Sequence, residues 1–485
     1  MIGPRRNWAN ARPAAGRPAR RLTSHACSRP HGATSPGNNV SGTAPPAGGL
    51  FFPQNQALGL DGTNFSPRVQ QKIVHAGVNS SSYQQASRDL AALGDLTVAP
   101  KPVERLVHRI GRERIDQRDA AVAAHAALPL MEKDGAADPQ RPCPAVAMVS
   151  MDGGRFQMRT TTPASAPLPE SPEPLAKASE PARKGHWRES KVAVLETYFS
   201  AVGDADPDPD VPRCFLDLKR TAETVRGLGH ALPTGLEFAA EGPAKEPDET
   251  TATSRGRTSR PGQPERLVRS VLASRACSDD FGPMMHQAAW ERNFFGAARR
   301  VFLGDGLPVN WTIHREHFST FTAILDFVHA LSYVFAGAFA GRPQAEGESV
   351  YQRWVQAVWS GQVATILPEL EARSAALGSP PAQCAETDPR QLVFDAWRYL
   401  KNNAERMHYE EYRRQGLPIM TSAVESVIKM INRRVKGSEK FWSAGGAEAI
   451  LQLRADHLSE TEVLPRFWAE REEQASASRR YRPAA

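Results

Sequence analysis

Residues 416–455, GLPIMTSAVESVIKMINRRVKGSEKFWSAGGAEAILQLRA, decide how we interpret this chain. The apolar residues of the first half recur at helical spacing, which predicts an amphipathic helix that begins after Ser422 and ends at Gly437. At 3.6 residues per turn, a second face of that helix carries Glu425, Lys429, Asn432 and Lys436. A carboxylate in the first turn followed by positive charge can hold a cation and a polyanion side by side.

Two interpretations of Glu425 compete. Ser422-Ala-Val-Glu425 fits a capping box, in which the glutamate side chain accepts the N–H of the cap residue. Glu425 and Lys429 also have the spacing of an ordinary i,i+4 ion pair. The helix alone leaves the structural and the functional interpretation open, and other acidic residues of the chain favour the functional one.

Two further carboxylates each follow an apolar, strand-like run and precede a glycine. They are Asp152 in AVAMVSMDGGRFQMR and Asp305 in RRVFLGDGLPVNW. The structural alternative is a hairpin, because Asp-Gly between alternating apolar residues is a strong turn signal. The order strand-Asp, strand-Asp, helix-Glu, with a basic helix attached to the last acid, is the order in which ribonuclease-H-like nucleases and transposases build a site for two divalent metals.

These motifs carry a specific resemblance. The run DGGR after a strand, GDG followed by Trp311 and ILDFVHALSYVF, and the 416–455 block resemble the DDE transposases of ISKra-type bacterial insertion sequences, over roughly residues 51–468. The resemblance implies Asp152, Asp305 and Glu425 as the three catalytic, metal-binding acids. It also implies Asp326 and His329, a D-x-x-H pair, as supporting residues.

The fold class that we expect is an α/β ribonuclease-H-like core with a mixed sheet, an α-helical insertion, an N-terminal helix-turn-helix-like domain and disordered Pro/Gly-rich segments. Three acids suit two Mg²⁺ or Mn²⁺ ions, because hard cations prefer oxygen ligands. The resemblance implies cleavage at the ends of a mobile element and transfer of the exposed 3′-OH to target DNA. Phosphates would be neutralised by Lys429, Arg433, Arg434, Lys436 and Lys440.

Composition is consistent with a DNA partner. Lys and Arg number 60 against 53 Asp and Glu, a formal charge of +7 and a pI near 9.2. The five cysteines show no CxxC spacing, and no apolar run has the roughly 20 residues of a membrane span. We therefore expect a cytoplasmic bacterial protein that binds double-stranded DNA, at least as a dimer when two ends are joined.

The order of segments follows from periodicity and from runs rich in Pro, Gly and Ser. A DNA-binding helix would carry Arg105 and Arg109, although a plain helical bundle with a solvated basic face fits the same pattern. The expected segments are an arm at 1–49, a helical domain at 50–131, the first part of the core at 145–340 with insertions 160–184 and 241–264, a helical insertion at 341–415, the catalytic-helix part at 416–468 and a polar tail at 469–485.

Several alternatives remain open at this level. Asp326 competes with Asp305 as the second acid, and we prefer Asp305 because glycines flank it at a strand end, whereas Asp326 lies in an apolar run beside His329. His314 and His317 form an H-x-x-H without a third partner at zinc-site spacing. The other functional classes are a transposase-derived DNA-binding protein or repressor without catalysis, and a nuclease of the same fold. Inverted repeats flanking the gene would distinguish a transposase from a nuclease.

Overall fold

The described part of the chain comprises residues 65–133, 135–159, 187–236, 263–420 and 422–477 of a computed structural model. The arm 1–49, the insertion 160–184 and nearly all of the insertion 241–264 lie outside the described residues. All described residues belong to one compact unit.

The centre of this unit is a mixed six-stranded sheet in the order β3-β2-β1-β4-β5, with β6 paired to the far end of β1. β2 is antiparallel to β1 and β3, whereas β4 is parallel to β1 and β5. The expected α/β architecture with a mixed sheet is confirmed. The strands are β1 Val146–Met158, β2 Trp187–Phe199, β3 Glu265–Ser274, β4 Arg299–Gly304, β5 Thr322–Leu325 and β6 Phe441–Trp442.

Helices surround the sheet and account for most of the remaining described residues. The helices before β5 are α2 Pro67–Asn79, α3 Tyr83–Gly94, α4 Pro100–Ala126, α5 Leu130–Lys133, α6 Arg213–Leu216, α7 Leu218–Gly227, α8 Ser278–Glu291 and α9 Pro308–His317. Those after β5 are α10 Phe327–Phe339, α11 Gln344–Trp359, α12 Leu367–Leu377, α13 Pro389–Asn403, α14 Tyr409–Arg414, α15 Ser422–Val435, α16 Ala444–Leu458 and α17 Val463–Ala477.

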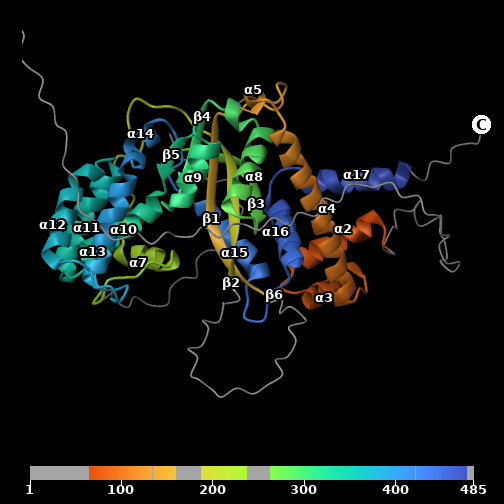
Figure 1. Cartoon of the computed structure of the whole chain (residues 1–485), viewed down its shortest axis with the longest axis horizontal. Helices are drawn as coiled ribbons and strands as arrows, with labels where there is room; N and C mark the ends of the chain where they lie inside the picture. The colour runs from red at the N-terminus through yellow and green to blue at the C-terminus, as the bar shows by residue number, and fades with distance from the viewer. Residues whose placement is uncertain (1–64, 134, 160–186, 237–262, 421, 478–485) are drawn as a thin grey trace, which may run out of the picture. The chain divides into compact units, whose positions relative to one another are not determined.

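Alternation along the strands divides the helices into two layers. Val146 and Met148 of β1 face the cluster built by α10, α11 and α13, whereas Ala147 and Val149 face α8 and α9. Farther along β1, Phe156 joins a third cluster with α15 and α16. Figure 1 shows β1 in the middle of the unit, with α10–α13 on one side of it and α2–α4 on the other. Both faces of the sheet are therefore covered along the first half of β1.

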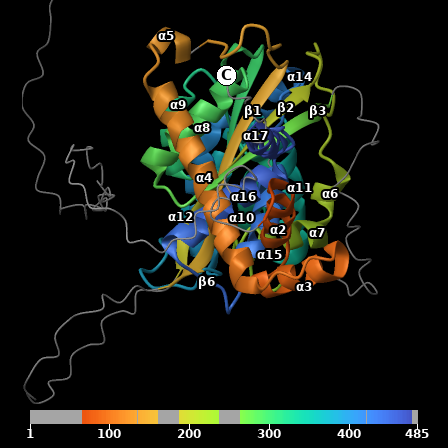
Figure 2. The same cartoon turned by 90° about the vertical axis from the view of Figure 1, so that its right-hand side faces the viewer.

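The segment expected to be helical, residues 50–131, contains α2, α3, α4 and the start of α5 in its described part. α4 is the longest of these helices, and Figure 2 shows it running past α16. The contact is close, because a Cβ on Gly111 of α4 would lie 2.6 Å from the Cβ of Ala449 of α16. These helices share one hydrophobic cluster with α15 and the sheet. Their core is therefore continuous with that of the predicted catalytic helix.

Some local predictions need correction. β1 continues through Asp152 and Gly153 to Met158, so the hairpin alternative at this position is wrong. β3 and β6 were not predicted, and α17 extends beyond Trp468 to Ala477. Trp354 and Trp359 are core residues as expected. Among the described residues, no helix combines the length and apolarity needed to cross a membrane.

Candidate functional site

Three neighbouring parallel strands carry an aspartate at the same level of the sheet. The pairing of β1 with β4 and of β4 with β5 keeps a fixed offset. Extended past the paired residues, these offsets bring Asp152 level with Asp305, and Asp305 level with Asp326. A hydrogen bond from the Asp326 N–H to the Gly304 carbonyl, at 2.8 Å, continues the ladder to this level. Parallel register therefore brings together acids that are far apart in the sequence.

Glu425 reaches the same place from α15, which lies against β1. A Cβ on Gly154 would meet Ser190 Oγ at 3.0 Å and Asn432 Oδ1 at 3.8 Å, so the glycine admits the helix close to the strand. The predicted helix is present as Ser422–Val435, and the predicted ion pair has Lys429 Nζ 3.7 Å from Glu425 Oε2. Ser422 begins the helix, and its side chain lies outside the described ones, so the capping box is not tested.

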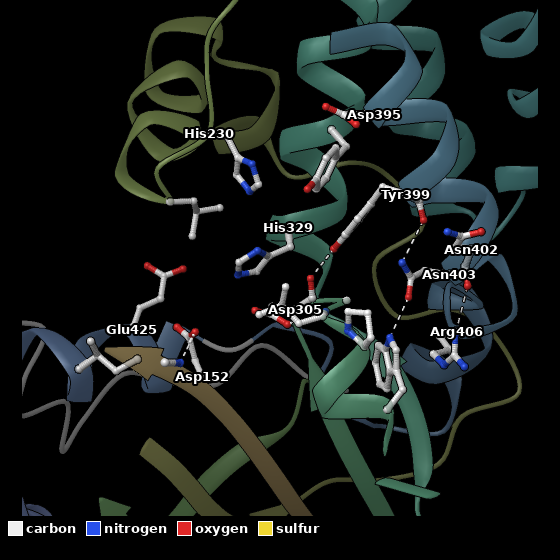
Figure 3. A pocket seen from close by; sticks show the side chains of 18 of the residues that line it. Asp152, His230, Asp305, His329, Asp395, Tyr399, Asn402, Asn403, Arg406 and Glu425 are labelled. Carbon is white, nitrogen blue, oxygen red and sulfur yellow. Dashed lines mark hydrogen bonds between the residues drawn. The ribbon is translucent and has the colours of Figure 1, made fainter. Parts of the chain in front are cut away.

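The acids line a cavity of about 1040 Å³, called the acid cavity below. Figure 3 shows the carboxylates of Asp152, Asp305 and Glu425, together with the imidazole of His329, around one open space. These residues come from β1, the loop after β4, α15 and α10 respectively. The structure thus brings together the three predicted acids and one of the two supporting residues.

Asp305 is held in place by several hydrogen bonds. Its Oδ1 accepts from the Leu307 N–H at 2.9 Å and from Asn310 Nδ2 at 2.7 Å, while its main-chain carbonyl accepts from the Tyr399 hydroxyl at 2.7 Å. Gly306 has φ +90°, and a Cβ there would lie 2.6 Å from the Tyr399 ring. The turn therefore requires glycine for two reasons, and it fixes the direction of the aspartate.

Burial and mutual repulsion raise the pKa of all three acids. Burial is the main cause that raises the pKa of Asp305 to about 6, and the charges of Asp152 and Asp326 raise it further. Burial also raises the pKa of Asp152 and of Glu425 above the usual range. The only cation within salt-bridge distance of these acids, among the described residues, is Lys429, whose side chain is 72% exposed. Their negative charge is thus largely uncompensated.

Asp326 differs from the other acids. It is 1% exposed and caps α10, because its Oδ1 accepts the backbone N–H groups of Val328 at 2.7 Å and His329 at 3.3 Å. It is not among the residues that line the acid cavity. Its contact with His329 is a helix cap through the backbone, so the supporting role predicted for the two side chains stays a prediction, and the burial of Asp326 favours Asp305 as the cavity acid.

The opposite wall of the acid cavity is basic and aromatic. α13 contributes Arg398, Tyr399 and Asn402, and Arg406 follows just after the helix. Arg406 lies 4.5 Å from the ring centre of Trp311, whose indole N–H donates to Asn403 Oδ1 at 3.1 Å. Sequence reasoning missed this wall. The signal was available, since Asp395, Arg398, Tyr399 and Asn402 recur at helical spacing along one face of α13.

The predicted phosphate-binding residues differ in their exposure to solvent. Lys429 lines the cavity, and Arg433 and Lys436 are exposed. Arg434 is 3% exposed, donates from Nε to the Gly77 carbonyl at 3.1 Å and lies 4.6 Å from the ring centre of Tyr83. Lys440 donates to the carbonyls of Arg433 and Arg434, at 3.2 and 3.1 Å. The prediction that Arg434 contacts phosphate is therefore corrected. Its buried guanidinium packs between α15 and the N-terminal helices.

The two N-terminal residues predicted to contact DNA also differ in exposure. Arg105 is exposed on α4, as a DNA contact requires. Arg109 is half-buried, with Nη2 donating to Gln70 Oε1 at 3.1 Å and Nε 3.7 Å from Glu113 Oε1. The contacts of Arg109 are those of a helix-packing residue.

The donor chemistry of the acid cavity fits a hard divalent cation. Within the described residues, no group of three or more His, Cys, Asp or Glu side chains is placed closely enough to hold a metal as it stands. The acids nevertheless face one space and repel one another, and carboxylate oxygens are the ligands that Mg²⁺ and Mn²⁺ prefer. No protein-family model matches the chain, and no curated protein is significantly similar to it. The functional argument therefore rests on this geometry and on the sequence motifs.

Proposed function

We propose that this protein is a metal-dependent DNA-cleaving and strand-transferring enzyme, a DDE transposase with a ribonuclease-H-like core. The observation that carries the proposal is the convergence of Asp152, Asp305 and Glu425 on one cavity, from the middle of β1, the loop after the parallel strand β4, and helix α15. The strand order β3-β2-β1-β4-β5, with β2 antiparallel to both neighbours, supports the ribonuclease-H-like assignment.

Asp152, Asp305 and Glu425 would hold Mg²⁺ or Mn²⁺. Two bound ions supply activation of the attacking oxygen and stabilisation of the leaving oxygen in phosphodiester cleavage. The chain's own contribution is to keep the carboxylates turned into the cavity. Tyr399 and Asn310 orient Asp305, and the close approach at Gly154 orients Glu425.

The substrate backbone would lie between the acids and the basic wall. Lys429 on one side and Arg398 and Arg406 on the other line the cavity, so phosphates can be neutralised from both walls. Arg398 is also 2.7 Å from Asp395, which limits its freedom to swing away. These contacts supply affinity that depends on salt and carries little sequence information.

The test is metal-dependent nicking and strand transfer on a duplex built from the DNA that flanks the gene. Wild type is compared with Glu425→Gln, and with Glu410→Gln as a control on the exposed surface of α14. We expect both activities with Mg²⁺ or Mn²⁺ in wild type and in Glu410→Gln, and neither in Glu425→Gln. Binding without cleavage by wild type would overturn the enzymatic proposal and favour a DNA-binding protein. Nicking without strand transfer would favour a nuclease.

A further inference from the structure

A second surface lies at the far ends of β1 and β2, where β6 joins them (Figure 1). Gln157 of β1 is paired on one side with Trp187 of β2 and on the other with Phe441 of β6. Residues directly opposite in neighbouring strands point to the same face. The two aromatic side chains therefore flank Gln157 on one face, and they are 43% and 39% exposed.

α8 and α9 cover this face of the sheet only along the first half of β1. Met151 still belongs to the α8–α9 cluster, whereas the next residues with the same orientation, Gly153 and Arg155, are exposed. An exposed tryptophan beside an exposed phenylalanine on an uncovered strand face indicates a binding surface rather than part of the core.

Cations border the aromatic pair. Arg155 and Arg159 are exposed on β1 and just after it, and Lys436, the residue after α15, has Nζ 5.7 Å from the ring centre of Trp187. Two acids are near: Glu189, the cross-strand partner of Arg155, lies 3.7 Å from Lys191, and the exposed Glu439 comes two residues before Phe441. We define the ribbon patch as these cations with the aromatic pair: Arg155, Arg159, Trp187, Lys436 and Phe441.

The ribbon patch continues from the acid cavity. Gly153 lines the cavity and has the same orientation on β1 as Arg155. Asn432 lines it as well, and Lys436 follows one helical turn later, directly after α15. The cavity and the patch are therefore adjacent along β1 and along the helix.

We propose that the ribbon patch binds a single-stranded stretch of DNA next to the site of cleavage. Unpaired bases stack on Trp187 and Phe441, and their phosphates contact Arg155, Arg159 and Lys436. Exposed aromatic rings bordered by cations are the combination that binds unpaired nucleotides, because every base has a face to stack and every nucleotide a negative charge. This inference rests on the proposed function, since it names the form of DNA that the same site handles.

The experiment is fluorescence anisotropy with the full chain, in EDTA, using a labelled single-stranded oligonucleotide and a blunt duplex of the same sequence. Trp187→Ala is compared with Phe199→Ala, which removes a 63% exposed aromatic side chain at the other end of the same strand. Trp187→Phe keeps a ring to stack and serves as the rescue. Circular dichroism and thermal unfolding establish that each variant is folded.

We expect Trp187→Ala to weaken single-strand binding by about tenfold, with Phe199→Ala and Trp187→Phe close to wild type. Equal effects of Trp187→Ala and Phe199→Ala would overturn the inference. So would wild type that nicks duplex DNA and binds no single strand, an outcome that leaves the proposed function intact. If wild type binds neither single-stranded nor duplex DNA, both this inference and the proposed function are overturned. If Trp187→Ala turns a dimer into a monomer with unchanged DNA affinity, the patch is an interface between copies.

Discussion

Two groups of carboxylates in this protein have opposite surroundings. Asp206 and Asp456 each face an arginine, Arg413 in the first case and Arg114, at 2.9 Å, in the second. Asp152 and Asp305 lie level with each other beside the acid cavity, and within the described residues neither has a cation within salt-bridge distance. Asp206 and Asp456 are thus paired with a cation, whereas Asp152 and Asp305 are not. This difference is what the proposed metal site requires, because carboxylates without a cationic side chain beside them remain available to a divalent cation.

The largest expected effect comes from neutralising a cavity acid. Asp305→Asn keeps the size of the side chain and removes its charge, so nicking should fall by about a thousandfold, corresponding to roughly 4 kcal/mol of lost transition-state stabilisation. Thermal stability should stay the same or rise, because a mutual repulsion is removed. Single-turnover nicking and a melting curve measure the two effects. A large loss of stability would mean that Asp305 is a structural acid like Asp206.

Removing a paired acid should have the opposite outcome. The side chains of Asp206 and Arg413 are 8% and 7% exposed, and Arg413 also lies 4.0 Å from the ring centre of Trp359. Asp206→Ala leaves a buried, unpaired guanidinium and should cost about 3 kcal/mol of stability. Chemical denaturation measures this, with the exposed neighbour Asp204→Ala as the control. If Asp206→Ala and Asp204→Ala are equally stable, the ion pair of Asp206 does not stabilise the fold.

A divalent cation should distinguish the two groups of carboxylates. Mg²⁺ at about a hundred times its dissociation constant should stabilise wild type by roughly 2.7 kcal/mol, because it binds the folded state alone. The double variant Asp305→Asn/Glu425→Gln should lose this stabilisation, whereas Asp204→Ala should keep it. Melting curves with and without MgCl₂, with NaCl of equal ionic strength as the reference, measure the effect. Equal stabilisation of wild type and the double variant would place the bound cation elsewhere.

The smallest expected effect concerns a buried base. Burial, and then the positive fields of His125, His317 and Lys133, lower the pKa of His286 on α8 to about 4. Below about pH 6.5 this histidine is protonated in the unfolded chain and stays neutral in the folded chain until the pH approaches 4. The free energy of unfolding is therefore highest above pH 6.5 and falls as the pH is lowered toward 4.

His286→Gln should remove part of this decline. Between pH 7 and pH 5 wild type should lose about 1 kcal/mol more than the variant, after allowance for the partial exposure of the ring. Urea denaturation at the two pH values is the measurement. A decline of the same size in the variant would assign the acid sensitivity to other groups.

Sequence reasoning reached the acids because each follows a local pattern. Asp152 and Asp305 come after apolar strand-like runs, and Glu425 lies in the first turn of an amphipathic helix. It missed the wall formed by Tyr399, Asn402 and Arg406, because a polar stripe on a helix is usually a solvated face. It also misassigned Arg434, since a basic residue on a helix gives no local sign that another part of the chain will bury it.

Local sequence was enough to place most strands and helices and to single out three acids, because hydrophobic periodicity and the residues at element ends act over a few residues. Only the tertiary structure decided which acids meet. The parallel register of β1, β4 and β5 brings Asp152, Asp305 and Asp326 level with one another, and the depth of packing separates Asp326 from the other two. Burial and mutual charge, which raise the pKa of Asp305, arise from groups far apart in the chain, and no local pattern encodes them.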